Sequence, residues 1–301
     1  MSWLVRSAVT LGAAAAGAFA YGVTVERHAY ILRRVTVPVL APRQRALRIL
    51  HISDLHLGRH DAKLVAWLRD LGDLHPDLVV STGDNVTEAE ALPALAEALG
   101  PLFRFPGVFV FGSNDYHKPF FKSPLQYFTG RRKEAPENLE LPTGALRDLF
   151  ESAGWRWAEQ QKFLMDVADR VIEVRGTGDA HIGLDDYGAV AGPPDELAAL
   201  TLGVTHAPYR RVLDGMAADG VALILAGHTH GGQVCLPGYG ALTTNSDLDP
   251  KRAKGLSWWE CGDRTAALHV SAGLGTSPYA PYRFACRPEA SLLILVPHAG
   301  V

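Results

Sequence analysis

The feature that most restricts the fold is an alternation of strand-like and helix-like segments in the first half of the chain. Three short apolar runs have the composition of buried strands, and two amphipathic runs between them have helical periodicity. The predicted strands are 47–53, 76–82 and 107–112, and the predicted helices are 61–73 and 88–100. Strands that alternate with helices form parallel sheets with crossover helices, so this region predicts an α/β fold.

The alternation stops after residue 116 and returns later. Residues 118–141 are rich in Pro, Lys, Arg and aromatic side chains and are predicted to form a long insertion. Further helices are predicted at 142–154, 194–200 and 209–217, and further strands at 162–167, 170–174, 201–205, 221–226 and 291–296. We therefore expect one domain over 47–298, preceded by a connector at 29–46. Pro38 and Pro42 exclude a regular helix in the connector and leave room for an edge strand.

Residues 1–28 form a hydrophobic leader. Ser7 to Val25 carries no charge and is dominated by Ala, Gly, Val and Leu, which is long enough to span a bilayer. The alternative is a secretory signal cleaved after Ala18-Phe19-Ala20. A soluble helix fits poorly because no polar face interrupts the run. Arginines are more frequent after the leader than before it, which favours a cytoplasmic domain, whereas a signal peptide implies export. The protein is expected to be membrane-associated or exported, with the side of the membrane open.

The charge balance argues against a nucleic-acid partner. The formal net charge is −3 over 301 residues, and Lys and Arg are not gathered into one strip. Proteins that bind nucleic acids through counterion release usually show a basic excess. A metal-dependent nuclease is therefore disfavoured.

Metal-capable side chains follow five of the predicted strands. In chain order they are Asp54 and His56, then Asp84, then Asn114, then His206, and finally His228 with His230. The carboxyl ends of strands in open α/β sheets meet where ligands bind, so these side chains are expected to converge. Mixed carboxylate and imidazole donors suit Zn, Mn or Fe better than Ca. Asp179-Ala180-His181 repeats the Asp-x-His pattern without a strand end to match, and is predicted to be a loop or a support beside the ligands.

These motifs resemble the calcineurin-like metallophosphoesterase superfamily. The resemblance rests on Asp54-x-His56, Gly83-Asp84-Asn85, Gly112-Ser113-Asn114-Asp115, His206 and Gly227-His228-Thr229-His230-Gly231-Gly232-Gln233. The last of these, with the leader, resembles the membrane-associated bacterial branch. The similarity covers residues 47–296. It implies a four-layer αββα sandwich of two mixed β-sheets, with the metal site at the carboxyl ends of the strands.

The resemblance also implies an activity and residue roles. The activity is hydrolysis of a phosphodiester by a hydroxide that bridges two divalent metal ions, Mn, Fe or Zn. Asp54, His56 and His230 would bind the first ion. His206 and His228 would bind the second, and Asp84 would bridge both because a carboxylate has two oxygens.

One motif departs from the family pattern. The usual third motif is Gly-Asn-His-Asp or Gly-Asn-His-Glu, in which the Asn is a ligand and the His assists the leaving group. An ungapped match places Ser113 at the ligand position, whereas a slip of one residue places Asn114 there. We predict Asn114, because an amide oxygen is a better ligand than a neutral hydroxyl. No histidine stands at the acid position, and His117 is the candidate substitute.

The sequence leaves the substrate open. Within 120–132, aromatic and basic side chains would suit a phospholipid or lipid-linked phosphate: Phe120, Phe121, Lys122, Tyr127, Phe128, Arg131 and Arg132. One alternative is a phosphomonoesterase acting on a small molecule. Another is a catalytically weakened metal-binding scaffold, which only the altered third motif supports and which the retained Asp and His set opposes.

Overall fold

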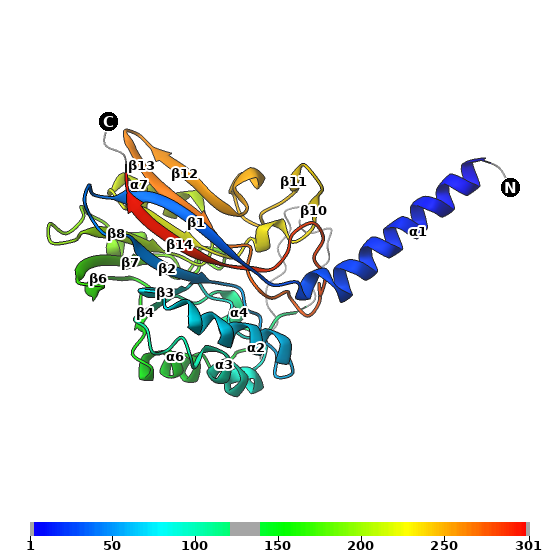
Figure 1. The fold of residues 1–301 in the computed structure, drawn as a ribbon, viewed down its shortest axis with the longest axis horizontal. Helices are drawn as coiled ribbons and strands as arrows, with labels where there is room; N and C mark the ends of the chain where they lie inside the picture. Colours follow the sequence, from blue (N-terminus) through cyan, green and yellow to red (C-terminus); the bar gives the residue numbers. More distant parts are fainter. Residues whose placement is uncertain (1–2, 121–138, 299–301) are drawn as a thin grey trace.

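Two β-sheets packed face to face form the body of the protein. The computed structural model describes residues 3–120 and 139–298. The first sheet has the order β1-β14-β2-β3-β4-β5 and the second β12-β13-β9-β8-β7-β6, and β10 and β11 form a separate hairpin. Helices cover the outer faces (Figure 1). This arrangement confirms the αββα sandwich of two mixed sheets.

The elements have the following bounds. The strands of the first sheet are β1 (Ile31–Leu40), β14 (Glu289–Pro297), β2 (Leu47–Ile52), β3 (Leu78–Ser81), β4 (Gly107–Phe109) and β5 (Arg156–Trp157). Those of the second are β12 (Gly255–Cys261), β13 (Arg264–Val270), β9 (Leu223–Ala226), β8 (Leu200–Val204), β7 (Arg170–Gly176) and β6 (Gln161–Val167), and the hairpin is β10 (Cys235–Leu236) with β11 (Gly240–Ala241). The α-helices are α1 (Trp3–Thr24), α2 (Ala62–Asp70), α3 (Leu92–Leu99), α4 (Ser113–Tyr116), α6 (Thr143–Ser152) and α7 (Arg210–Ala218). The 3-10 turns are η1 (Glu26–His28), η2 (Leu71–Leu74), η3 (Ala89–Ala91), η4 (Tyr187–Val190), η5 (His230–Gly232) and η6 (Pro250–Arg252).

The period of two along each strand divides the core into layers. In β2, Ile49 packs between the sheets, while Leu50 faces α2, α3 and α6 on the outer side. In β9, Leu223 packs between the sheets, while Ile224 faces α7. Each sheet is therefore apolar on both faces. This explains why the strands appear in the sequence as continuous apolar runs rather than as alternating ones.

The parallel strands run in one direction within each sheet. In the first sheet β2, β3, β4 and β5 are parallel, and in the second β7, β8, β9 and β13 are parallel. Their carboxyl ends therefore lie on one edge of each sheet. Because the sheets pack face to face, loops from both meet at that edge.

The connector contributes to the first sheet. Residues 31–40 form strand β1, which pairs in parallel with β14. Pro38 lies on this edge strand beside a register shift, a position that tolerates the loss of its backbone N–H.

Helix α1 projects away from the sheets (Figure 1). Residues 9–28 are long and apolar enough to cross a membrane by length and composition, and 11% of that stretch is buried. η1 and the last turns of α1 contact the rest of the chain. They do so mainly through the segment before β14.

The helix predicted at 194–200 is wrong, because that stretch forms turns leading into β8. Pro193 and Pro194 precede it, and its backbone N–H groups bond elsewhere: Asp195 N–H donates to Glu173 (2.6 Å) and Ala199 N–H to Val171 O (2.9 Å). The aromatic and basic side chains proposed for substrate contact, Phe120 excepted, lie outside the described residues.

Candidate metal centre

The ligands predicted from five strand ends come together at one edge of the sandwich. Asp54, Asp84 and Asn114 follow strands β2, β3 and β4 of the first sheet. His206 and His228 follow strands β8 and β9 of the second. The site therefore lies between the sheets, and neither sheet alone supplies all of its donors.

One group of donors is compact. The ligand atoms of Asp54, His56, Asp84 and His230 all lie within 4.8 Å of one another. Nε2 of His56 lies 3.1 Å from Nε2 of His230 and 3.4 Å from Oδ2 of Asp84. Nε2 of His230 lies 3.6 Å from Oδ1 of Asp54. These are the residues expected at the first ion, together with the expected bridge.

A second group surrounds the other side of Asp84. Nε2 of His206 lies 3.6 Å from Asp84 Oδ2, and the ring centroids of His206 and His228 are 5.2 Å apart. Nε2 of His228 lies 3.2 Å from the carbonyl oxygen of Asn245. Because a carbonyl only accepts, Nε2 carries the proton and Nδ1 of His228 keeps the lone pair that a cation requires.

Asn114, and not Ser113, contacts the expected bridge. Its side-chain amide donates to Asp84 Oδ2 (2.7 Å) and its backbone N–H to Asp84 Oδ1 (2.8 Å). Within the described parts of the chain, no hydrogen bond joins the Ser113 hydroxyl to Asp84. Ligation by Asn114 would require its amide to turn so that the oxygen faces the site.

The ligand loops have unusual backbone geometry. Asp54, His56, Asp84, His228 and His230 have φ values of 49°, 41°, 56°, 68° and 50°. This left-handed region is rare for L-residues and costs energy. Hydrogen bonds between the loops hold it in place: Asp54 N–H donates to Gly83 O and His56 N–H to Asp84 O, both at 2.9 Å. Such strain is concentrated at functional sites.

Asp115 fixes the two loops of the first sheet relative to each other. Its buried carboxylate accepts hydrogen bonds from the backbone N–H groups of Asp84 (2.7 Å), Asn85 (2.7 Å) and Gly112 (3.0 Å). The side-chain amide of Asn85 adds a fourth at 3.1 Å. Asp115 is thus a structural centre behind the ligands rather than a donor to a cation.

Negative charge is concentrated around His206. Burial raises the pKa of Asp54 and of Asp179 to about 6 each. Burial would lower the pKa of His206, but the carboxylates of Asp84, Asp179 and Asp54 outweigh it and raise that pKa to about 9. Burial opposes ionisation of Asp84 as well, yet His206, His56 and the amide of Asn114 hold its pKa below the usual range. The buried carboxylates of the centre therefore outnumber the positively charged groups beside them.

The donor set fits divalent cations. Nδ1 of His206 donates to the carbonyl oxygen of Thr82 (2.6 Å), so Nε2 is the nitrogen that a cation would bind in place of the proton that the carboxylates favour there. That Nε2 is buried and has no hydrogen-bond partner among the described residues. Burial also lowers the pKa of His56 and, more strongly, that of His230, so both imidazoles are neutral. The imidazoles of His206, His56 and His230 thus face the carboxylates of Asp54 and Asp84. A bound cation would be stabilised by this set of nitrogen and oxygen donors.

Gly112 makes room for this arrangement. A Cβ at this position would collide with Asp84 Oδ1 and with the His206 ring. Any larger residue would displace the expected bridge and a ligand together.

Three residues near the centre had only a supporting role or no role in the sequence analysis. Asp179 and His181 lie in a loop beside the ligands, as expected, but this loop follows β7, whose end at Gly176 was not matched to them. The His181 ring centroid lies 4.4 Å from that of His228. The alternation over 170–176 was the signal available for this strand end.

Arg283 had no sequence signal. Its guanidinium is buried and donates to the carbonyl oxygens of Ala272 and Gly275, both at 2.8 Å. One of its nitrogens lies 3.3 Å from Nδ1 of His230. Arg283 therefore supports the His230 loop from behind.

His117 remains a prediction as a proton donor. It is partly buried, and its backbone forms an isolated bridge with Glu140. Among the described residues, no hydrogen bond or ion pair joins its side chain to the metal ligands.

A buried hydrogen-bond chain leads from between the sheets to Asp54. Ser53 Oγ donates to Asp54 Oδ2 (2.6 Å), and Thr82 Oγ1 donates to Ser53 Oγ (2.7 Å). Both hydroxyl protons are then used, so Nε2 of His51 donates to Thr82 Oγ1 (2.9 Å). Nδ1 of His51 consequently accepts from Nδ1 of His269 (3.0 Å). Burial lowers the pKa of both histidines, that of His269 to about 4, so both are neutral.

This chain predicts a role for His51 in metal affinity. In His51→Leu the volume is retained but Thr82 loses its donor, so Asp54 is less firmly oriented. We expect metal affinity to fall about 10- to 100-fold, the usual effect of removing a partner of a ligand. His51→Gln retains a donor close to Nε2 and should recover most of the affinity. Titration calorimetry with Mn²⁺ measures both, and equal affinities for wild type and His51→Leu would contradict the role.

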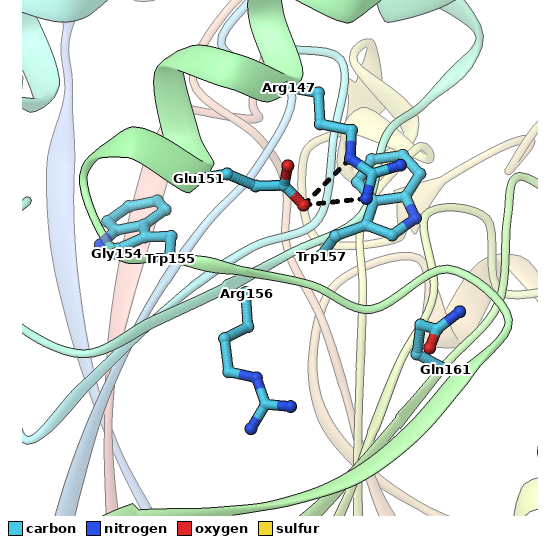
Figure 2. A pocket seen from close by; sticks show the side chains of 7 residues that line it. All are labelled: Arg147, Glu151, Gly154, Trp155, Arg156, Trp157 and Gln161. Carbon is cyan, nitrogen blue, oxygen red and sulfur yellow. Dashed lines mark hydrogen bonds and ion pairs between the residues drawn. The ribbon is translucent and has the colours of Figure 1, made fainter.

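One surface pocket lies away from the metal centre. It has a volume of about 500 Å³ and is lined by Arg147, Glu151, Gly154, Trp155, Arg156, Trp157 and Gln161. Figure 2 shows Arg147 paired with Glu151 beside Trp157, at the junction of α6 and β5. None of the metal ligands lines this pocket.

Comparison with known proteins identifies the family to which the chain belongs. Residues 47–232 match the family model described as calcineurin-like phosphoesterase. The chain is 25% identical over 304 residues to the uncharacterized protein YpbG of Bacillus subtilis, covering 98% of each. It is 28% identical over 255 residues to the phosphodiesterase YaeI of Escherichia coli, covering 83% of this chain and 82% of that one. It is also 28% identical over 284 residues to the UDP-2,3-diacylglucosamine pyrophosphatase LpxG of Chlamydia trachomatis, covering 82% and 83%. The family match spans more than half of the chain, which therefore belongs to the calcineurin-like phosphoesterases and is a metal-dependent phosphoester hydrolase.

Proposed function

We propose that the protein hydrolyses a phosphodiester at a centre that holds two divalent cations, Mn, Fe or Zn. The observation that carries this proposal is the position of Asp84. Its Oδ2 lies 3.4 Å from Nε2 of His56 and 3.6 Å from Nε2 of His206, so one carboxylate adjoins both donor groups. Carboxylates in that position join the two halves of binuclear hydrolytic centres.

The residues divide into two ligand sets. Asp54, His56 and His230 would hold one cation, and His206, His228 and Asn114 the other, with Asp84 shared. When bound, such cations make a water molecule more acidic and neutralise phosphate oxygens. The chain orients the ligands through Asp115, Arg283 and the hydrogen-bond chain that ends at Asp54. No nucleophilic side chain is required, because water supplies the attacking oxygen.

A poor leaving group, such as an alkoxide, needs a proton as it departs. The family's histidine is replaced in the third motif, and the amide of Asn114 is too weak an acid to protonate a leaving group. His117 is the proposed substitute. We therefore expect a preference for activated leaving groups over alkyl ones.

The substrate and the location are proposed from the leader and the relatives. One relative is named a phosphodiesterase and another a pyrophosphatase of a diacylated sugar nucleotide, which carries acyl chains. Together with the exposed, apolar α1, these names support a phospholipid or lipid-linked substrate. We propose residues 1–28 as a membrane anchor, residues 29–46 as the connection and residues 47–298 as the catalytic domain, with residues 118–141 inserted in it.

Metal content and substrate preference test this function together. Full-length protein in detergent should contain about two equivalents of transition metal, and a chelator should abolish turnover that Mn²⁺ restores. Bis(p-nitrophenyl) phosphate should be hydrolysed faster than p-nitrophenyl phosphate and much faster than a dialkyl phosphate.

Three results would contradict the proposal. A faster rate on the monoester would indicate a phosphomonoesterase. Bound metal without turnover on any ester would indicate the weakened scaffold. Equal rates on activated and alkyl diesters would refute the predicted leaving-group bias.

A further inference from the structure

Exposed apolar side chains gather on the β10–β11 hairpin. Val234, Leu236, Tyr239 and Leu242 expose 39%, 50%, 73% and 52% of their surface. They lie in a run, residues 231–246, that contains no charged side chain. Single exposed apolar residues are ordinary on protein surfaces, but several on one short, uncharged hairpin form a patch that indicates a binding surface.

The hairpin is attached to the base of α1. Val234 forms a bridge with Phe284, and Cys235 N–H donates to Phe284 O (2.8 Å). The adjacent Arg283 N–H donates to Gly22 O in α1 (3.3 Å). Residues 283–284 therefore link hairpin and helix directly, and Figure 1 shows the hairpin on the side of the domain from which α1 projects.

Further contacts make this link rigid. The carboxylate of Glu26 accepts from the backbone N–H groups of Ala285 (3.1 Å) and Cys286 (2.7 Å), and it is buried. Arg27 donates to the carbonyl oxygen of Pro281 (3.2 Å). The end of the helix and the segment that carries the hairpin are thus held in one arrangement.

The same hairpin adjoins the metal centre on both of its sides. On the N-terminal side, Gln233 N–H donates to the carbonyl oxygen of the ligand His230 (3.0 Å). On the C-terminal side, the carbonyl oxygen of Asn245 contacts Nε2 of the ligand His228 (3.2 Å). A surface bound by the hairpin would therefore lie next to the catalytic ligands.

We propose that the β10–β11 hairpin is a lipid-contacting surface that enters the interfacial layer of the bilayer crossed by α1. This inference rests on the proposed membrane anchor. The occupant is a bilayer rather than another protein, because the helix that leaves the domain beside the hairpin is itself apolar and exposed. Tyr239 at the turn has the amphipathic side chain favoured at membrane–water interfaces. Insertion is shallow, since a two-stranded hairpin has backbone groups that require water. The metal centre is thereby held at the lipid surface, where a phosphate ester of a lipid headgroup lies.

Photocrosslinking of the full chain in phosphatidylcholine–phosphatidylglycerol nanodiscs tests this surface. A p-benzoylphenylalanine at Tyr239 should label lipid, whereas the same group at Leu197 should not. Leu197 is a matched control, because it has the same exposure of 73% and lies before β8, at the opposite end of that strand from His206. Labelling that is equal at the two positions, or absent at Tyr239, would overturn the proposal.

A probe at Leu11 separates the possible failures. Leu11 lies in α1 and is 71% exposed, so its labelling reports whether the helix is in the bilayer. Lipid labelling from Leu11 without labelling from Tyr239 rejects the hairpin alone, and labelling from neither rejects the shared bilayer as well. Turnover of soluble bis(p-nitrophenyl) phosphate is measured on the same samples, so that loss of the proposed activity is recognised independently.

Charged substitutions provide a second test. Leu236→Glu combined with Tyr239→Glu should reduce lipid labelling from a probe at Leu242 at least fivefold and leave labelling from Leu11 unchanged. Leu197→Glu should change neither. Both variants should hydrolyse soluble diester within about twofold of wild type, which shows that they fold. Unchanged labelling from Leu242 in the double variant would contradict insertion.

Discussion

Asp84→Ala is expected to abolish binding of both cations and to reduce turnover on the order of 10³-fold or more. Asp84 adjoins His56 on one side and His206 on the other, so its loss opens both ligand sets. It also accepts two hydrogen bonds from Asn114, which would then be free to move away from the site. Elemental analysis and diester turnover on the same preparation measure the two losses.

Two controls make this test specific. Asp84→Asn has the same shape and lacks the charge, so it should retain the fold but bind metal weakly. Asp169→Ala removes an exposed carboxylate with 89% side-chain exposure and should leave metal content and rate unchanged. Full activity in Asp84→Ala would show that Asp84 does not bridge the cations.

Asp115→Ala is expected to destabilise the fold by roughly 4 kcal/mol, because it leaves buried donors without acceptors. Four N–H groups from Asp84, Asn85 and Gly112 lose their partner at once. The measurement is urea unfolding of full-length protein in detergent with a chelator present. Because the chelator removes metal from both proteins, loss of metal does not contribute to the difference between their free energies of unfolding.

Two further variants, measured in the same way, test whether the lost hydrogen bonds cause the destabilisation. Asp115→Asn retains one acceptor oxygen and should lose about half as much free energy of unfolding. The chelator-treated Asp84→Ala protein should lose less than Asp115→Ala, because Asp84 accepts only from Asn114 among the described hydrogen bonds. A change below about 1 kcal/mol in Asp115→Ala would show that water replaces the carboxylate.

The third motif illustrates where local sequence stops being informative. The order Gly112-Ser113-Asn114-Asp115 left two registers open for the ligand. The backbone turn of α4 brings both the side chain and the N–H of Asn114 to Asp84, which supports Asn114 over Ser113 as the proposed ligand. It also turns Asp115 inward, where its carboxylate binds the loops and not a cation.

Local patterns in the sequence were enough to locate the strand ends and the metal-binding side chains that follow them. Apolar runs followed by Asp54, Asp84, His206 and His228 are local patterns, because a strand must be buried and its carboxyl end must emerge beside its neighbours. The distant groups that support those ligands are known only from the packing of the folded chain. Arg283 behind His230 and the His51–His269 pair behind Asp54 join residues that are 53 and 218 positions apart. No local periodicity reports such contacts, since they arise only when two separate sheets pack together and their buried polar groups must find partners.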